Sequence, residues 1–259
     1  MNKCLLGLGL GVLSAFSSPA FSIVNIEGMQ LDKNDKAAAF VGQLNLAISG
    51  KNGNTNNFKA GLGGRLQWFE TGYTRFMVFN HEYGESADVK DTDKSFLHLR
   101  HIHYYSDSLA WELFGQLERN EFTRLSMRAL AGAGVRWTLL EQPVRHALDL
   151  GLGGFYSVEK LDDTTGTTDG GRDNVTRANI YLVYKYKISD NARLTNTAYY
   201  QPDVEETSDY RLLDQFGLQV DLNSSLSLSI SIDVAKDNQP PQNIKATDTS
   251  YTTSLVYKF

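Results

Sequence analysis

Apolar and polar residues alternate one by one along most of this chain. The clearest stretch is residues 226–234, where five leucine, isoleucine and valine residues alternate with three serines and an aspartate. Successive side chains of a β-strand point to opposite faces, whereas a helix would scatter these residues around its circumference. The pattern therefore predicts strands with one apolar face and one polar, hydroxyl-rich face.

The same alternation recurs in about twelve segments, most of them about 9–14 residues long. Strands of soluble sandwiches are shorter, at about 5–6 residues, whereas a tilted strand that crosses a bilayer needs about 9–11. In hydrocarbon every backbone N–H and C=O group needs a partner, and only closure removes both edges of a sheet. We therefore predict an all-β fold, a closed antiparallel up-and-down transmembrane β-barrel. Its predicted strands are residues 37–50, 57–70, 73–83, 95–105, 109–119, 122–137, 147–160, 174–188, 193–202, 210–222, 225–236 and 248–259.

The connections between these segments alternate in length. Short ones lie at 71–72, 106–108, 189–191 and 223–224, and long polar ones at 84–94, 161–173, 203–209 and 237–247. Outer-membrane barrels have short periplasmic turns and longer external loops. An even strand number with both termini in the periplasm places every long segment outside. The short external connections at 51–56 and 119–122 and the longer internal one at 138–146 fit this scheme less well.

Aromatic residues gather at the predicted strand ends. Trp68, Trp111 and Trp137 lie at predicted periplasmic ends, whereas Tyr200 and Tyr210 lie at predicted outer ends. Aromatic residues favour strands in general. Their concentration at the ends is nevertheless typical of the two aromatic girdles of a membrane barrel.

The N-terminus has the features of a secretory signal peptide. A lysine at position 3 is followed by a short apolar run over residues 4–16 and then by small residues up to Ser22. The run is shorter than the roughly 20 residues of a membrane-spanning helix. We predict a cleaved signal peptide over residues 1–22, with cleavage after Ser22, and an N-terminal periplasmic segment over residues 23–36 before a barrel over residues 37–259. Cys4 is the only cysteine, so the mature chain would carry no thiol.

The last segment ends in alternating bulky residues. Tyr251, Leu255, Tyr257 and the terminal Phe259 share one phase of the alternation. This pattern resembles the C-terminal insertion signal of bacterial outer-membrane proteins, which the barrel-assembly machinery reads. Such a machine can recognise an exposed strand edge by β-augmentation.

Charged residues on the polar phase are the main candidates for a functional site. Arg124, Arg128 and Arg136 share a face of one predicted strand, and Glu112 and Glu118 lie on the preceding strand. Since the two strands are hairpin neighbours, opposite charges can meet across the ladder inside the lumen. Two interpretations stay open: a charged constriction that filters solutes, or an internal network that fills the lumen.

Other chemistry has weaker support in the sequence. His101 and His103 lie two residues apart, with His98 nearby, but no carboxylate at clear ligand spacing accompanies them. Lipid hydrolysis would need a serine activated by a base, for which His81 and His98 are candidates, yet no serine-elbow motif occurs. The net charge of −5 and the lack of a basic patch argue against nucleic-acid binding. We expect no enzyme activity, no cofactor and no metal site.

Several short motifs resemble a family of outer-membrane proteins that are described as salt-induced and form a domain of unknown function. The motifs are Gly50-x-x-Gly53-Asn54-Thr55, Leu97-x-x-Arg100, Trp111-Glu112-Leu113-Phe114-Gly115-Gln116, Phe122-x-Arg124-Leu125-x-x-Arg128, Gly132-Ala133-Gly134, Tyr200-Gln201-Pro202, Thr247-Asp248-Thr249 and Tyr257-Lys258-Phe259. The resemblance spans nearly the whole mature chain. It implies an outer-membrane barrel and brings no catalytic residues.

Together these features predict a bacterial outer-membrane barrel, either a narrow passive pore for small solutes or a structural envelope protein. The alternatives are a lipid-modifying hydrolase of the outer membrane and a soluble extracytoplasmic β-sandwich. The expected partners are outer-membrane lipids, lipopolysaccharide and the barrel-assembly machinery, with no nucleic acid. The sequence leaves the solute and the oligomeric state open.

Overall fold

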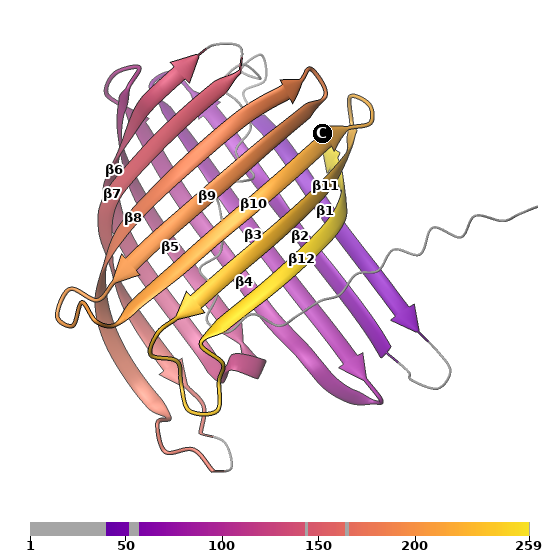
Figure 1. Cartoon of the computed structure of the whole chain (residues 1–259), viewed down its shortest axis with the longest axis vertical. Helices are drawn as coiled ribbons and strands as arrows, with labels where there is room; N and C mark the ends of the chain where they lie inside the picture. Colours follow the sequence, from indigo (N-terminus) through magenta and orange to yellow (C-terminus); the bar gives the residue numbers. More distant parts are fainter. Residues whose placement is uncertain (1–39, 52–56, 143–144, 164–165, 259) are drawn as a thin grey trace, which may run out of the picture.

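The computed structural model describes residues 40–51, 57–142, 145–163 and 166–258. These residues form twelve antiparallel strands in one closed barrel (Figure 1). The strands are β1 Phe40–Lys51, β2 Asn57–Glu70, β3 Tyr73–Ser86, β4 Val89–Tyr104, β5 Leu109–Asn120, β6 Leu125–Gln142, β7 His146–Leu161, β8 Gly171–Ser189, β9 Ala192–Pro202, β10 Tyr210–Asp221, β11 Leu226–Asp237 and β12 Thr247–Lys258. The predicted fold class is therefore confirmed. In the described part of the chain, no helix is long and apolar enough to cross a membrane.

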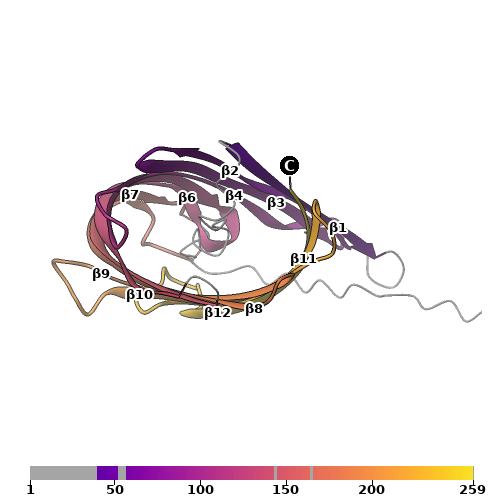
Figure 2. The same cartoon turned by 90° about the horizontal axis from the view of Figure 1, so that it is seen from above.

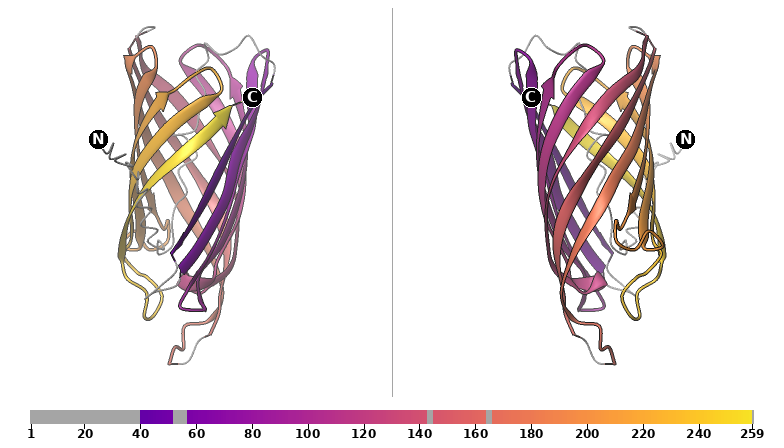
Figure 3. Two further views of the ribbon diagram at one scale, coloured as in Figure 1. Left: turned by 90° about the vertical axis from the view of Figure 1, so that its right-hand side faces the viewer. Right: turned by 90° about the vertical axis from the view of Figure 1, so that its left-hand side faces the viewer.

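Each strand pairs with the next one along the chain, and β1 pairs with β12 to close the ring, which is seen end-on in Figure 2. The strands are tilted in the side views of Figures 1 and 3. The connections at residues 71–72, 105–108, 190–191 and 222–225 lie at one end, which we call the tight-turn end. The connections at 162–170, 203–209 and 238–246 lie at the other, which we call the long-loop end.

Outward and inward side chains alternate as the sequence pattern requires. On β11, Ile230 and Ile232 face outward with 41% and 46% of their surface exposed, whereas Ser227 faces inward and is fully buried. A wide belt of exposed leucine, isoleucine and valine side chains surrounds the barrel. These exposed apolar side chains need an apolar environment outside the barrel, because polar residues of the other phase face the interior.

The predicted long loop over residues 84–94 is wrong. β3 continues to Ser86 and β4 begins at Val89, so the connection is the two-residue turn Ala87-Asp88. Both turn residues have positive φ, 50° and 62°, as a tight hairpin turn requires. The error arose because the pairing of β3 with β4 continues past the apolar belt into polar residues, where the alternation of hydrophobicity ends before the strand does. The predicted connection over 138–146 is also shorter, because β6 extends to Gln142 through a register shift between Thr138 and Leu140 that breaks the alternation.

The prediction that Arg124 lies on the same strand as Arg128 is also wrong. Residues Glu121–Thr123 form a short 3-10 helix, and Arg124 follows it with a left-handed φ of 61°. The side chain of Asn120 accepts a hydrogen bond of 3.2 Å from the N–H of Phe122 and so caps this turn. β6 begins only at Leu125, and Arg124 points toward the loops instead of along the strand.

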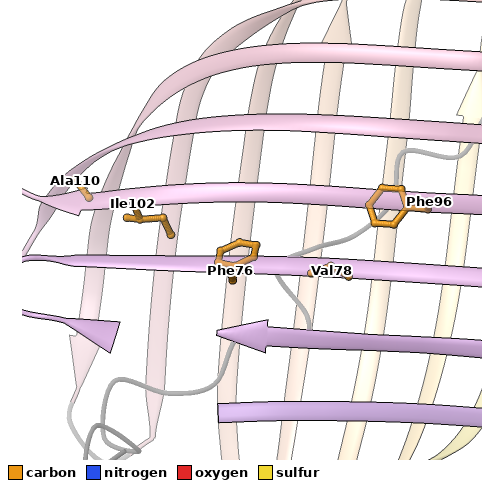
Figure 4. Packing of buried hydrophobic residues seen from close by; sticks show 5 residues of the cluster. All are labelled: Phe76, Val78, Phe96, Ile102 and Ala110. Carbon is orange, nitrogen blue, oxygen red and sulfur yellow. The ribbon is translucent and has the colours of Figure 1, made fainter. Parts of the chain in front are cut away.

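The interior also contains apolar residues that alternation alone does not reveal. Phe76, Val78, Phe96, Ile102 and Ala110 form a buried cluster on the inner faces of β3, β4 and β5 (Figure 4). Both phases of β3 and β4 are rich in apolar residues, so hydrophobicity could not fix which phase faces inward. This cluster fills part of the lumen with side chains that exclude water.

The closing seam differs from every other strand pair. β1 pairs with β2 at twelve positions, from Phe40 with Trp68 to Lys51 with Asn57. It pairs with β12 at only three, Gln43 with Lys258, Leu44 with Tyr257 and Asn45 with Val256. In the side views of Figure 3, β1 and β12 meet near the C-terminus and diverge toward the long-loop end.

Candidate functional site

The barrel interior is the candidate site, and five charged residues form its most extended feature. Arg128 lies between Glu118 and Glu159, with N···O distances of 3.0 and 2.9 Å. Arg211 continues the series to Glu159 at 2.8 Å and to Asp237 at 3.0 Å. We call these five residues the charge chain. It crosses from β7 directly to β10, so it runs through the lumen instead of along the wall.

All five members of the charge chain are buried. Glu159 accepts hydrogen bonds from both guanidinium groups, and Ser157 Oγ donates a further one at 3.4 Å. A buried carboxylate keeps its charge only when it is paired and hydrogen-bonded in this way. The arrangement fixes Arg128 and Arg211 in the lumen and blocks the space between β7 and β10.

A second group fills the lumen closer to the tight-turn end. Arg100 on β4 donates to Glu112 on β5 at 3.1 Å, and Tyr181 on β8 donates to the other oxygen of Glu112 at 2.8 Å. Gly151 is the cross-strand partner of Tyr181, and any Cβ at this glycine would overlap the tyrosine ring. Glycine is therefore required here so that Tyr181 can lie over β7 and reach Glu112.

Arg136 is paired with Asp149 on the neighbouring strand, at 2.9 Å. Thr138 donates to the same carboxylate at 2.8 Å. Together with the charge chain, which Arg211 joins from β10, and the Glu112 group, this pair fills the side of the lumen next to β5–β8. We call this region the filled half of the lumen.

His98 takes part in the filling, not in a catalytic arrangement. Its ring stacks against Phe76, Phe96 and Phe114, with centroid distances of 6.2, 6.2 and 6.1 Å. Its Nδ1 lies 3.2 Å from Gln116 Oε1. Among the contacts described for His98, none involves a serine hydroxyl, so the interpretation of this residue as a base for serine loses its geometric support.

The other half of the lumen is a cavity of about 330 Å³. The residues that line it come from β1–β5 and β9–β12, and none comes from β6, β7 or β8. We call the inner faces of β10–β12 and β1–β3 the open half. Small hydroxyl, amide and glycine residues dominate it, and the clearest set is Gly61, Gly63, Gln215, Gly217, Ser229, Ser231, Ser250, Thr252 and Ser254.

This cavity extends along most of the barrel. On β12 its lining runs from Asp248 to Val256. Eight residue steps of about 3.4 Å give roughly 27 Å along a tilted strand. Glu82 and Lys94, an ion pair of 2.9 Å, border the cavity near the long-loop end.

A polar cluster borders the tight-turn end. Asp221 contacts Lys258 at 2.7 Å and Arg193 at 3.4 Å, and it accepts a hydrogen bond of 2.6 Å from Ser227. Arg193 also lines the cavity. The cavity thus has ion pairs near both ends, and between them mostly hydroxyl, amide and glycine residues together with the carboxylate of Asp233.

Arg124 joins two loops at the long-loop end. Its guanidinium contacts Asp169 at 2.6 Å and donates to the carbonyl oxygens of Gln242 and Asp162 at 3.1 and 3.0 Å. The N–H of Gln242 donates to Asp169 at 2.7 Å. Partial burial opposes ionisation of Asp169, but the Gln242 N–H and the Arg124 guanidinium outweigh it and hold the pKa of this carboxyl below its ordinary value.

The five residues singled out by the sequence lie in two places. Glu112, Glu118, Arg128 and Arg136 are buried on the inner faces of β5 and β6, whereas Arg124 lies at the long-loop end. The expected contact across the β5–β6 ladder forms between Glu118 and Arg128. Glu112 and Arg136 find partners elsewhere. Sequence reasoning did not single out Arg100, Glu159, Tyr181, Arg211 and Asp237 as site residues. The charge and strand phase of Arg100, Glu159 and Arg211 were visible signals, whereas Asp237 fell in a predicted loop and Tyr181 carries no charge.

The remaining histidines face outward. His81 is exposed near the long-loop end, and its Nδ1 lies 2.9 Å from Ser95 Oγ on β4. His101 and His103 stack on Trp111 near the tight-turn end, each with a centroid distance of 5.3 Å. In the described part of the chain, no three histidine, cysteine, aspartate or glutamate side chains are grouped so as to hold a metal ion.

The expected insertion signal is partly described. Tyr251, Leu255 and Tyr257 are exposed on the outer face of β12. Phe259 and the expected signal peptide with Ser22 lie outside the described residues, as does the expected segment 23–36.

Comparison with known proteins adds the family and supports the fold. Residues 44–259 match the family described as "Protein of unknown function, DUF481". The chain belongs to this family. No curated protein matches it.

Among solved structures, the NanC porin is similar, with a TM-score of 0.51 and 14% identity over 84% of this chain and 98% of that one. The translocator domain of the autotransporter NalP from Neisseria meningitidis has a TM-score of 0.51 and 13% identity, over 84% of this chain and 87% of that one. At these identities the likeness shows the fold alone. That fold is the one that outer-membrane β-barrels adopt.

Proposed function

We propose that this DUF481 protein is a narrow passive pore of the bacterial outer membrane that admits small hydrophilic solutes. The observation that carries this proposal is the cavity of about 330 Å³, which follows β12 from Asp248 to Val256 beside a filled half. Twelve strands are enough to leave such a passage, whereas about eight are just filled by side chains. Because the filled half takes up much of the lumen, the passage suits a small solute, not a polymer in compact form.

The outer face supports the membrane location. Trp68, Trp111 and Trp137 are exposed at the tight-turn end, and Tyr200 is exposed at the other end of the belt. Interfacial aromatic residues of this kind border the apolar belt of membrane barrels. We assign the tight-turn end to the periplasm and the long-loop end to the outside.

The lining indicates which solutes are favoured. Hydroxyl and amide groups hydrogen-bond neutral polar molecules such as sugars, and the carboxylate of Asp233 favours cations over anions. The only described ammonium or guanidinium groups on the lining, those of Lys94, Arg119 and Arg193, are in ion pairs with Glu82, Asp93 and Asp221. The passage is thus expected to prefer neutral and cationic solutes.

Single-channel recording in planar bilayers tests the proposal. The purified protein, shown to be folded by its heat-modifiable migration on a gel, is expected to give small, stable conductance steps. It is also expected to accelerate the swelling of liposomes in a monosaccharide solution. A folded barrel that gives neither current nor swelling would contradict the proposed pore and would favour a role as a structural envelope protein.

The interactions expected with the envelope are part of the same proposal. Deletion of the terminal Phe259 is expected to slow insertion of the barrel by the assembly machinery. The measurement is the fraction of the protein that migrates in folded form on a gel. Lys160, an exposed cation near the long-loop end, suits the anionic headgroups of lipopolysaccharide. N-terminal sequencing of the mature protein checks cleavage after Ser22, and transcript levels at high salt check the salt induction that the family resemblance implies.

One observation favours a second function. His81 Nδ1 and Ser95 Oγ are 2.9 Å apart on the outward face, in the region where the outer leaflet would lie, and a histidine at this distance can activate a serine. A lipid ester hydrolase would then use Ser95 as nucleophile and His81 as base. Release of fatty acid from lipopolysaccharide that is abolished by both Ser95→Ala and His81→Ala, with the fold retained, would support it. Background release from all three proteins would exclude it.

A further inference from the structure

The seam between β1 and β12 stops short. Both strands continue toward the long-loop end after the last shared pair, Asn45 with Val256. The same register would create six further pairs, from Leu46 with Leu255 to Lys51 with Ser250, and none of these forms. Every other pair of neighbouring strands shares at least nine paired positions, whereas β1 and β12 diverge (Figure 3).

The unpaired edges leave outward side chains uncovered. Leu46 and Ile48 on β1 are 63% and 68% exposed, compared with 47% for Leu62, which lies on β2 directly beside Leu46. On the other side of the gap, Leu255 is 50% exposed. The gap therefore has apolar rims, but the backbone groups along its edges need polar partners, which hydrocarbon alone does not offer.

The lumen cavity reaches this gap. Leu46 faces outward and yet lines the cavity. The inner face of β12 lines it as well, with Ser250, Thr252 and Ser254 next to the unpaired edge. A hydroxyl-lined space is thus continuous with an apolar opening in the barrel wall.

We propose that the gap between β1 and β12 is a lateral portal, through which an amphipathic molecule with an uncharged, hydroxyl-rich headgroup reaches the cavity from the bilayer. The headgroup hydrogen-bonds to the serine and threonine row of β12 and β11, and the hydrocarbon tail stays between Leu46, Ile48 and Leu255. The carboxylate of Asp233 disfavours an anionic headgroup. This inference rests on the proposed membrane location, but it does not require conduction through the lumen.

The cavity volume agrees with this occupant. About 330 Å³ lies at the lower limit of known small-molecule pockets, which suits a sugar-sized headgroup and not a whole lipid. A polypeptide strand added at the gap would also satisfy the edges, but it would have no need of the hydroxyl-lined space behind them. Because β1 and β12 already share their register, the portal can close by forming the six missing pairs without any strand sliding.

The test uses the fact that the single cysteine of the chain, Cys4, lies in the expected signal peptide. The variant I48C/T253C places two thiols across the portal at positions that would pair if the seam closed. The matched control I48C/A60C uses the same residue of β1 and its existing partner on β2. Both variants are reconstituted in phosphatidylcholine vesicles, checked for folding by heat-modifiable migration, and compared in reduced and oxidised form. A bismaleimide of short span replaces the disulfide if the portal thiols do not oxidise.

The readout is photolabelling by an alkyl glucoside that carries a diazirine at the junction between its glucose headgroup and its chain, with the labelled residues mapped by mass spectrometry. We expect labelling of Ser250, Thr252 and Ser254 on the inner face of β12 in the wild type and in both reduced variants. Crosslinking the portal pair should reduce this labelling to the background of inward residues on β9, such as Thr197, whereas crosslinking the control pair should leave it unchanged. An alkyl phosphate probe of the same chain length should label these serines less.

Two results would overturn the portal: inner-face labelling at background in the wild type, or labelling that persists after the portal pair is crosslinked. Capture of a polypeptide instead of the glucoside by the portal thiols in native membranes would also overturn it. Conductance recorded from the same samples tests the proposed pore independently of the portal. An absence of conductance would contradict the pore, and the labelling result would still test the portal.

Discussion

The two halves of the lumen lie on the same twelve strands but differ in how much space their inward side chains fill. The filled half carries large side chains in ion pairs and hydrogen bonds: Arg128 and Arg136 pair with carboxylates on neighbouring strands, whereas Tyr181 reaches across the lumen to Glu112. The open half carries serine, threonine and glycine at equivalent positions, and it keeps a cavity of about 330 Å³. The difference teaches that strand number sets the space available, while the residues of one phase decide how much of it stays open.

The two halves of the lumen also differ in the interactions that their inward side chains make. In the filled half, each buried charge depends on its partner, because desolvation makes an unpaired ion in the interior costly. In the open half, hydroxyl groups face a space that water can occupy, so a hydroxyl that loses a protein partner can hydrogen-bond to water instead. Substitutions should therefore be severe on one side and mild on the other.

The largest effect is expected at the centre of the charge chain. Glu159→Gln removes the negative charge between Arg128 and Arg211, and loss of one partner of a buried ion pair destabilises by about 3–5 kcal/mol. Reversible urea unfolding in lipid vesicles, followed by tryptophan fluorescence, measures the free energy of unfolding. The matched substitution in the open half, Ser229→Ala, should change it by no more than about 0.5 kcal/mol. Equal effects of the two variants would contradict the division into halves.

A bulky residue should close the open half. Ser231→Trp places an indole in the cavity and is expected to reduce single-channel conductance several-fold, while Ile232→Trp, one residue along, faces outward and should leave it unchanged. Both proteins must pass the same folding check by gel migration. If the two substitutions lower the current equally, the passage does not run along β11.

A smaller effect is expected on ion selectivity. Asp233 lines the cavity and accepts hydrogen bonds from Gln215 and from Ser231. Asp233→Asn should lower the preference for cations, read as a shift of the reversal potential in a salt gradient toward zero. Asp190→Asn, in a turn at the tight-turn end, provides a control with the same change in net charge. A shift of equal size in the control would mean that the field of the whole protein, and not Asp233, sets selectivity.

Particular residues show how much of the fold and of the candidate site could be predicted from the sequence. The serine and isoleucine phases of β11 alone indicated which side faces inward, and the pair Glu118–Arg128 followed from hairpin adjacency. Arg211 and Glu159 could not be joined in the same way, since they lie on β10 and β7 and meet only because the barrel curves. Phe76 and Phe96 were ambiguous because both phases of their strands are apolar. The early end of the β1–β12 seam has no counterpart in the alternation, which continues through both strands.

The smallest effect concerns the contact that joins the two halves at the long-loop end. Arg124 and Asp169 hold the loop of the filled half, between β7 and β8, to Gln242 in the loop of the open half, between β11 and β12. Since the pKa of Asp169 is below its ordinary value of about 3.9, its contribution is present above that value and is lost as the pH falls through the lowered pKa. Loop cleavage by a neutral protease should therefore be faster in Asp169→Asn than in the wild type at pH 7, and with an acid-stable protease the two should converge toward pH 2–3. Thr167→Ala, in the same loop, should retain the wild-type pH dependence. The free energy of unfolding of the barrel should stay unchanged in both variants, because the contact joins loops and no strand pair depends on it.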